Sequence, residues 1–141
     1  MEEKGQRSSA ILLIENDDGD VFFFRRAIAK TGWSGEVRVV GTATEARAYM
    51  ENAHPFTDKE YYPRPRLIVA DYRLSGHTAL EFVEWLHGEP ALADIPIVIL
   101  SGAIAALSAE VLDQIKPAGF IQKTADIEKL AEAVEPFLPS A

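Results

Sequence analysis

The chain has 141 residues, of which 48% are hydrophobic and 26% charged, and this length and balance predict one globular domain. Its 14 Lys and Arg against 22 Asp and Glu give a net charge of −8, which argues against a nucleic-acid or membrane-surface partner. The absence of cysteine excludes a disulfide scaffold, thiol catalysis and Cys-ligated zinc.

The first part of the chain predicts three strands and two helices. Short apolar runs predict buried strands, and apolar positions at helical spacing predict helices. Asp18 is expected to cap the first helix, and Thr42 or Thr44 the second. In chain order we predict a strand at Ala10–Ile14, a helix at Asp18–Lys30, a strand at Glu36–Val40, a helix at Thr42–Asn52, a Pro-rich loop at His54–Arg66 and a strand at Leu67–Ala70 that ends at Asp71.

The second part continues the alternation of helices and strands. We predict a helix at Thr78–His87, a strand at Ile95–Leu100, a helix at Leu107–Lys116, a strand at Gly119–Gln122 and a helix at Ala125–Phe137. Five alternations predict an α/β domain with a five-stranded parallel sheet and helices on both faces. We expect this domain to span residues 10–138, after a disordered tail at residues 1–9, with residues 54–66 as an insertion and without an output domain.

Polar residues follow four of the predicted strands. Glu15 and Asn16 follow the first, Asp71 the third, Ser101 the fourth and Lys123 the fifth. Because the carboxyl ends of parallel strands meet at one edge of a sheet, these side chains are expected to converge where such sheets bind ligands.

This set of side chains suits metal-assisted phosphoryl transfer. Neighbouring carboxylates repel one another unless a cation lies between them, and Mg²⁺ prefers oxygen ligands. A carboxylate such as Asp71 can act as a nucleophile toward a phosphoryl group. The Lys123 ammonium and the Ser101 hydroxyl would then stabilise charge on the transferred oxygens.

The segments ILLIENDDGD, LIVADYRL, IPIVILSGA and AGFIQK, and the separations of Asp71, Ser101 and Lys123, resemble the receiver domains of two-component response regulators. The resemblance covers nearly the whole chain. It implies the doubly wound, flavodoxin-like fold with strand order 2-1-3-4-5. The Pro-rich insertion before the third strand resembles the single-domain regulators associated with phytochrome-type kinases.

The resemblance implies a role for each site residue. Asp71 matches the phosphoacceptor, and Mg²⁺ is expected on Glu15, Asn16, Asp71 and the backbone carbonyl of Arg73. The remaining positions match residues that act on the phosphoryl group: the switch residues Ser101 and Phe120, the phosphate-binding Lys123, the small residue Gly102, and Arg73 and Ala103, which tune the lifetime of the phosphoryl group.

The resemblance also implies partners. A histidine kinase or phosphotransfer protein would phosphorylate the domain, and a downstream protein would bind it. The fourth helix, fifth strand and fifth helix would form the contact or homodimer surface. We expect a phosphoacceptor that loses its phosphoryl group slowly, rather than an enzyme with a separate substrate. We expect it in the cytoplasm, because the polar first ten residues contain no targeting signal.

The sequence leaves alternatives open. A degenerate receiver that is not phosphorylated is the main alternative: Asn16, where the family usually has Asp, supports it, whereas Asp71, Ser101 and Lys123 argue against it. A phosphohydrolase is disfavoured because Arg73 stands where a second acid is expected. A flavodoxin-like electron carrier is disfavoured because the acidic ENDDGD segment would repel the phosphate of a flavin.

Overall fold

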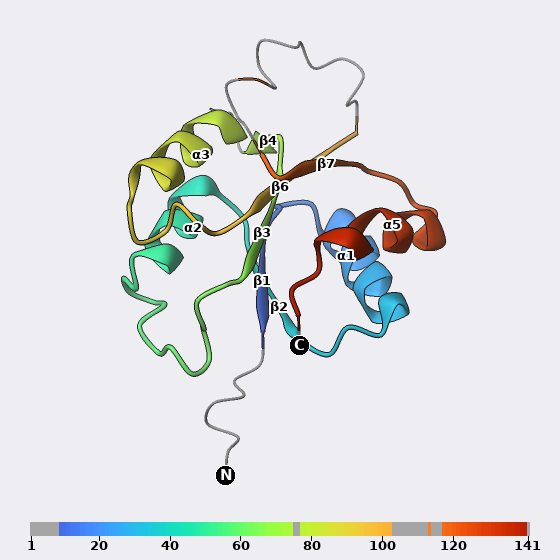
Figure 1. The fold of residues 1–141 in the computed structure, drawn as a ribbon, viewed down its shortest axis with the longest axis horizontal. Helices are drawn as coiled ribbons and strands as arrows, with labels where there is room; N and C mark the ends of the chain where they lie inside the picture. The colour runs from blue at the N-terminus through green and yellow to red at the C-terminus, as the bar shows by residue number, and fades with distance from the viewer. Residues whose placement is uncertain (1–8, 75–76, 103–112, 114–116, 141) are drawn as a thin grey trace.

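The computed structural model describes residues 9–74, 77–102, 113 and 117–140. Five parallel strands form its central sheet in the order β2-β1-β3-β6-β7, which confirms the predicted order 2-1-3-4-5 counted along these five strands (Figure 1). The five strands are β1 (Ala10–Ile14), β2 (Glu36–Val40), β3 (Leu67–Asp71), β6 (Ile97–Ser101) and β7 (Gly119–Gln122).

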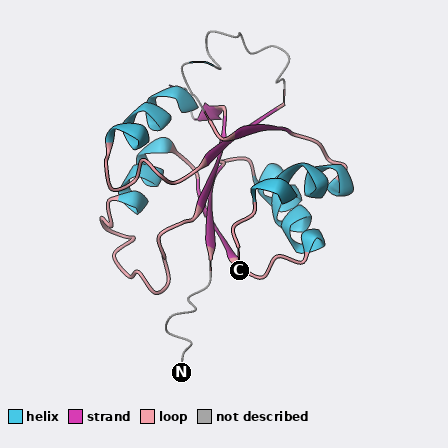
Figure 2. Cartoon of the chain, viewed as in Figure 1, coloured by secondary structure: helices cyan, strands magenta, loops and turns pink. Residues whose placement is uncertain are grey.

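Helices cover both faces of this sheet (Figure 2). On one face lie α1 (Asp18–Thr31) and α5 (Ile127–Val134), which pack against each other. On the other face lie α2 (Ala43–Met50) and α3 (Ala79–Gly88). The helix predicted at Leu107–Lys116 lies outside the described residues.

Burial on both faces explains why the sequence of the internal strand β1 is apolar throughout. All five residues of β1 are buried. Successive side chains of a strand point to opposite faces, so Leu12 and Ile14 join the core beneath α2 and α3, whereas Ile11 and Leu13 join the core beneath α1 and α5. A continuous apolar run therefore predicted an internal strand correctly.

Several boundaries differ from the prediction. The third helix begins at Ala79 rather than Thr78, which belongs to a short strand. Strand β6 begins at Ile97 rather than Ile95, because Pro96 has no N–H for the strand ladder.

Asp17, not Asp18, caps α1, because its Oδ1 accepts a hydrogen bond from the Gly19 amide at 3.0 Å. The last helix is shorter than the predicted Ala125–Phe137. It begins after the cap Asp126, and a 3₁₀ turn follows at Glu135–Phe137, where Pro136 has no N–H to continue the helical hydrogen bonds.

The second helix is capped by Thr42, whose side chain accepts a hydrogen bond from the Glu45 amide at 3.0 Å. This helix ends at Met50, two residues before the predicted end, and Asn52 has a φ of 59°. A left-handed backbone is incompatible with a continuing right-handed helix.

A two-stranded antiparallel ladder follows the central strand and was not predicted. It pairs β4 (Arg73–Leu74) with β5 (His77–Thr78). Two-residue strands are too short to give a periodic sequence signal. The ladder begins two residues after Asp71, at the carboxyl end of β3.

The segment at residues 54–66 forms neither helix nor strand, as predicted. Its aromatic side chains anchor it to α2: Phe56 and Tyr62 contact the ring of Tyr49, whose hydroxyl donates a hydrogen bond to the Pro63 carbonyl at 2.7 Å. This insertion is therefore packed against the domain and lies before the amino end of β3.

The two ends of the described chain meet near the start of the sheet. Ser9 is buried, and its hydroxyl donates a hydrogen bond to the Ser140 carbonyl at 3.1 Å. The Trp33 indole N–H donates to the Pro139 carbonyl at 3.0 Å. Within the described part of the chain, no helix is long and apolar enough to cross a membrane.

Candidate functional site

The carboxyl edge of the sheet brings together residues that are far apart in the sequence. Glu15 directly follows β1, Asp71 ends β3 and Lys123 directly follows β7. The parallel arrangement of these strands places all three at the same edge. Asp20 reaches the same place from the first turn of α1.

The Lys123 ammonium lies among three carboxylates. Its Nζ is 2.7 Å from Asp20 Oδ2 and 3.1 Å from Asp71 Oδ2, and it donates a hydrogen bond to each. It is also 3.0 Å from Glu15 Oε1, an ionic contact outside hydrogen-bond geometry. Burial by itself would lower the pKa of Lys123, but the contacts with Asp20, Glu15 and Asp71 outweigh it and raise that pKa above its ordinary value.

Glu15 is the most buried acid of the site, with 2% of its surface exposed. Its Oε2 accepts a hydrogen bond from the Asp17 amide at 3.1 Å, whereas Oε1 is buried and accepts no hydrogen bond from the described residues. Burial raises the pKa of this carboxyl, and the contacts with Lys123 and the Asp17 amide offset the effect only in part. The Oε1 oxygen is therefore held by its ionic contact with the Lys123 ammonium.

Sequence analysis did not identify Asp20 as a site residue. A sequence signal was present, because Asp20 belongs to the first turn of the helix that follows β1 and so lies at the carboxyl edge of the sheet. Its contact with Lys123 joins positions 103 residues apart, and local patterns carry no information about such a pairing.

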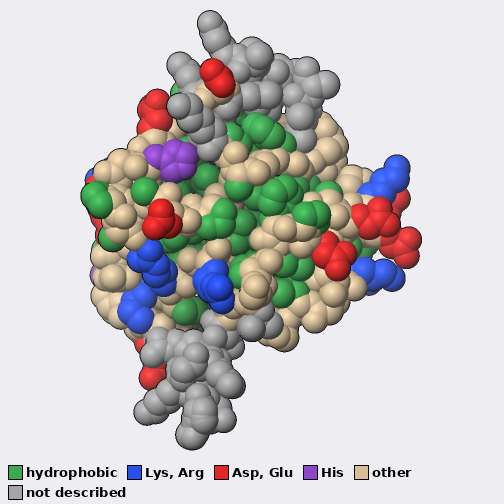
Figure 3. Space-filling model, in the orientation of Figure 1, with side chains coloured by type: hydrophobic (Ala, Val, Ile, Leu, Met, Phe, Trp, Pro, Cys, Tyr) green, Lys and Arg blue, Asp and Glu red, His purple; other side chains and the backbone are tan. Residues whose placement is uncertain are grey.

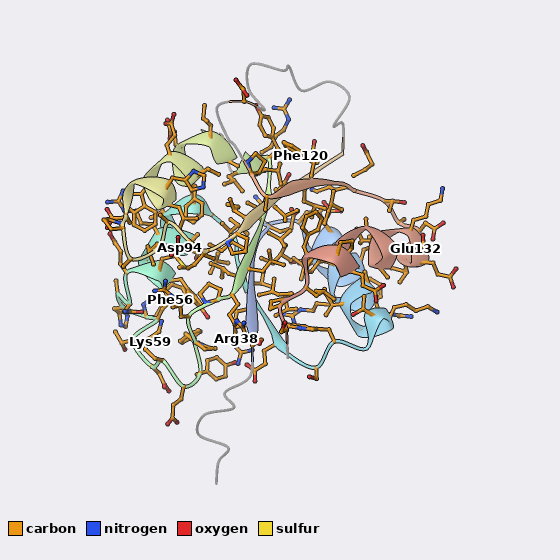
Figure 4. All side chains as sticks on the ribbon, in the orientation of Figure 1. Arg38, Phe56, Lys59, Asp94, Phe120 and Glu132 are labelled. Atoms are coloured by element: carbon orange, nitrogen blue, oxygen red, sulfur yellow. The ribbon has the colours of Figure 1, made fainter. Side chains whose placement is uncertain are left out.

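Three further predicted site residues, Ser101, Gly102 and Phe120, belong to β6, the residue after it and β7. Ser101 ends β6 and is buried, and it is paired in register with Gln122 of β7. The Gly102 carbonyl accepts a hydrogen bond from the Gln122 side chain at 2.6 Å. Phe120, labelled in Figure 4, is half-buried against the core beneath α2 and α3.

Arg73 and Asn16 were predicted to contribute ligands to Mg²⁺. The Arg73 amide donates a hydrogen bond to Asp71 Oδ1 at 3.3 Å, which places the backbone of Arg73 beside the acid. Asn16 lies next to Glu15 with an exposed side chain. Ala103 lies outside the described residues.

Comparisons with known proteins identify the architecture. No protein-family model matches the sequence, and no curated protein matches it. Among solved structures, the phosphorylated cyanobacterial phytochrome response regulator RcpA is 25% identical with a TM-score of 0.76, over 92% of this chain and 91% of that one. A response regulator in red-light signalling of R. palustris is 20% identical with a TM-score of 0.80, over 92% and 90%.

The fold is that of a response regulator receiver domain. A third similar structure is the Mn²⁺-bound form of response regulator Rcp1, which is 21% identical with a TM-score of 0.77, over 94% of this chain and 99% of that one. The structural neighbours thus include receivers from phytochrome signalling, in agreement with the resemblance seen in the sequence.

The donor set of this receiver fold suits a hard divalent cation. Three carboxylates against one ammonium leave the cluster with an excess of two negative charges when all are ionised. Both oxygens of Glu15 and those of Asp71 are carboxylate oxygens, which are the ligands that Mg²⁺ prefers. No group of three or more His, Cys, Asp or Glu side chains in the described part of the chain is arranged as a metal site. The ligands predicted for Mg²⁺ are not such a group of three, because they combine the Glu15 and Asp71 carboxylates with the Asn16 amide and the backbone carbonyl of Arg73.

Proposed function

We propose that this chain is a receiver that accepts a phosphoryl group on Asp71 from a histidine kinase or a phosphotransfer protein. The observation that carries this proposal is the place of Asp71 at the carboxyl end of the central strand, 3.1 Å from the Lys123 ammonium. An ammonium at this distance is placed to neutralise negative charge that develops on a transferred group. The side chain of Asp71 is 13% exposed, so an incoming phosphoryl group has access to it.

In the proposed reaction a carboxylate oxygen of Asp71 forms a bond to phosphorus. The bond between phosphorus and the imidazole nitrogen of the donor histidine breaks, and its electron pair stays with that nitrogen. Lys123 contacts Asp71 before the transfer and would contact the phosphoryl oxygens after it. A bound Mg²⁺ would supply positive charge that stabilises the phosphoryl oxygens. Its ligands would be Glu15, Asn16, Asp71 and the Arg73 carbonyl.

Other residues would convert this reaction into a signal. In our proposal Ser101 hydrogen-bonds the phosphoryl group, and Phe120 changes its packing in response. Gly102 leaves space beside the group, and Arg73 and Ala103 tune its lifetime. A downstream protein, or a second copy of the chain, would then bind the surface that includes β7 and α5.

The test is to incubate the protein with Mg²⁺ and acetyl phosphate and to measure its intact mass. We expect the parent protein to gain one phosphoryl group and Asp71→Asn to gain none. Asp17→Asn is a matched control, because Asp17 lies near the site but caps α1, and it should be phosphorylated like the parent. Phosphorylation of Asp71→Asn would show that another residue is the acceptor.

A degenerate receiver is the second candidate function, and Asn16 favours it. An amide ligand brings no negative charge, so it binds Mg²⁺ more weakly than the Asp usual at this place in the family. In this case neither acetyl phosphate nor beryllofluoride with Mg²⁺ would change the mass or the NMR spectrum. Recovery of phosphorylation in Asn16→Asp would then locate the defect in the metal site.

A further inference from the structure

A cavity of about 370 Å³ lies away from the Asp71 site, between the end of α2, the 54–66 insertion and the segment before β6. Its apolar wall includes Tyr49, Met50 and Leu92, and three cationic residues line it as well: Lys59, Arg64 and Arg66. These elements lie at the amino ends of the strands, because the insertion leads into β3 and the Arg66 amide pairs with the Ala10 carbonyl at the start of β1. The cavity is therefore at the edge of the sheet opposite the Asp71 site.

The charge of this cavity is unusual for an acidic protein. The chain has eight more acidic than basic residues, yet no carboxylate of the described residues is within ion-pair distance of Lys59, Arg64 or Arg66. Their hydrogen-bond acceptors among the described residues are uncharged oxygens: the Phe56 carbonyl for Lys59, the Ala91 carbonyl for Arg64, and the Ser9 hydroxyl and Ser140 carbonyl for Arg66. Figure 3 shows basic side chains gathered at the lower left, on the side of the molecule where Figure 4 labels Lys59.

Lys59 is the most informative of the three cations. Its ammonium lies 4.8 Å from the centre of the Tyr49 ring, and its one hydrogen bond to the protein, at 3.4 Å to the Phe56 carbonyl, is long. Partial burial lowers the pKa of this amine. A cation that has lost water without gaining an anionic partner is placed to bind an anion.

We propose that this cavity binds an aromatic carboxylate. The aromatic ring would occupy the apolar part beside Tyr49, Met50 and Leu92, and the carboxylate would contact Lys59 and Arg64. A volume of about 370 Å³ is within the range of pockets that hold small organic ligands, which combine apolar walls with a few polar groups. Such a ligand would give the domain a second binding site, independent of phosphorylation at Asp71.

The test uses 2-naphthoate as the probe and 2-naphthalenemethanol as its uncharged counterpart. Each is titrated into the isotope-labelled full chain, and amide NMR shifts are followed. We expect 2-naphthoate to shift the amides around Tyr49, Lys59 and Leu92 and to bind at least about tenfold more tightly than the alcohol. Asp71→Asn should bind the probe like the parent, which separates this test from that of the proposed function.

Two Lys variants test the role of the charge. Lys59→Gln should weaken 2-naphthoate binding about tenfold. Lys30→Gln should leave it unchanged, because Lys30 lies on α1 and pairs with Glu128. Thermal unfolding should show Lys59→Gln to be at least as stable as the parent, since the change removes a partly buried charge. Equal binding of acid and alcohol, equal effects of the two variants, or shifts confined to the Asp71 site would overturn the proposal.

Discussion

The ammonium of Lys123 lies closer to Asp20, at 2.7 Å, than to the predicted acceptor Asp71, at 3.1 Å. Asp20 belongs to α1, and Lys123 follows the edge strand β7. This contact therefore connects the first helix to the last strand of the sheet. In this structure the lysine is therefore shared between a proposed reacting group and a carboxylate at the edge of the site.

We expect Asp20→Asn to lower the free energy of unfolding by about 1 kcal/mol, because an ion pair at a partly exposed site becomes a weaker hydrogen bond from the Lys123 ammonium to an uncharged amide. Asp18→Asn is the matched control. It also removes a negative charge from the first turn of α1, but the change affects only the helix dipole and should cost a few tenths of a kcal/mol at most. Urea unfolding measures both, and equal losses would show that the Lys123 contact adds no stability.

Removing the ammonium itself should have a larger effect. Lys123→Met leaves Glu15, Asp20 and Asp71 without a cation, and we expect it to lower the free energy of unfolding by about 2–3 kcal/mol at pH 7. The raised pKa of Lys123 means that its stabilisation is complete below its ordinary value of 10.5 and is lost as the pH rises beyond it.

The pH dependence of Lys123→Met distinguishes charge from packing. Without the ammonium, Glu15 loses the contact that partly offsets its burial, so the penalty of ionising this carboxyl is present at neutral pH and disappears as the pH falls and Glu15 takes up a proton. Urea unfolding at pH 7 and at about pH 4 should therefore show a smaller deficit at the lower pH. A deficit of the same size at both pH values would indicate lost packing instead.

Glu15→Gln should stabilise the protein in the absence of a divalent metal ion. Because burial raises the pKa of Glu15, its ionisation opposes folding, and this cost appears as the pH rises above the ordinary value of 4.5. The Gln carbonyl can still accept the hydrogen bond from the Asp17 amide. We expect the variant to exceed the parent in unfolding free energy at pH 7 and the gap to close at about pH 4. Lower stability of the variant at pH 7 would contradict this prediction.

The same substitution should weaken metal binding, because it removes a negative charge from the predicted ligands. Titration with Mg²⁺ followed by NMR would measure the loss. Gln at this position would then increase stability and reduce function, as is common where charged groups are held at a functional site.

Tyr49→Phe should loosen the 54–66 insertion. The buried hydroxyl donates a hydrogen bond to the Pro63 carbonyl, and its loss should cost about 1 kcal/mol in unfolding free energy. Tyr61→Phe is the control, because Tyr61 belongs to the same insertion but is 56% exposed, and its change should stay within about 0.5 kcal/mol. Similar losses in the two variants would mean that the Tyr49 hydroxyl does not anchor the insertion.

The sequence predicted those parts of the fold that depend on local pattern. Strands buried on both faces need continuous apolar runs, and β1 has the predicted bounds. The edge strand β2 also has the predicted bounds, although it contains Glu36 and Arg38. Helix ends were less predictable, because several acids compete to cap α1 and only the backbone geometry selects Asp17 over Asp18. The β4–β5 ladder was missed because two residues per strand give no periodicity.

The sequence by itself determined that Glu15, Asp71 and Lys123 would meet, since residues that follow parallel strands share one edge of the sheet. The tertiary structure alone decided that Asp20 pairs with Lys123, and that Lys59, Arg64 and Arg66 line one cavity without an acidic partner among the described residues. These features depend on contacts between segments far apart in the chain. Such contacts are fixed by how helices and loops pack against the sheet, and no local pattern of residues encodes that packing.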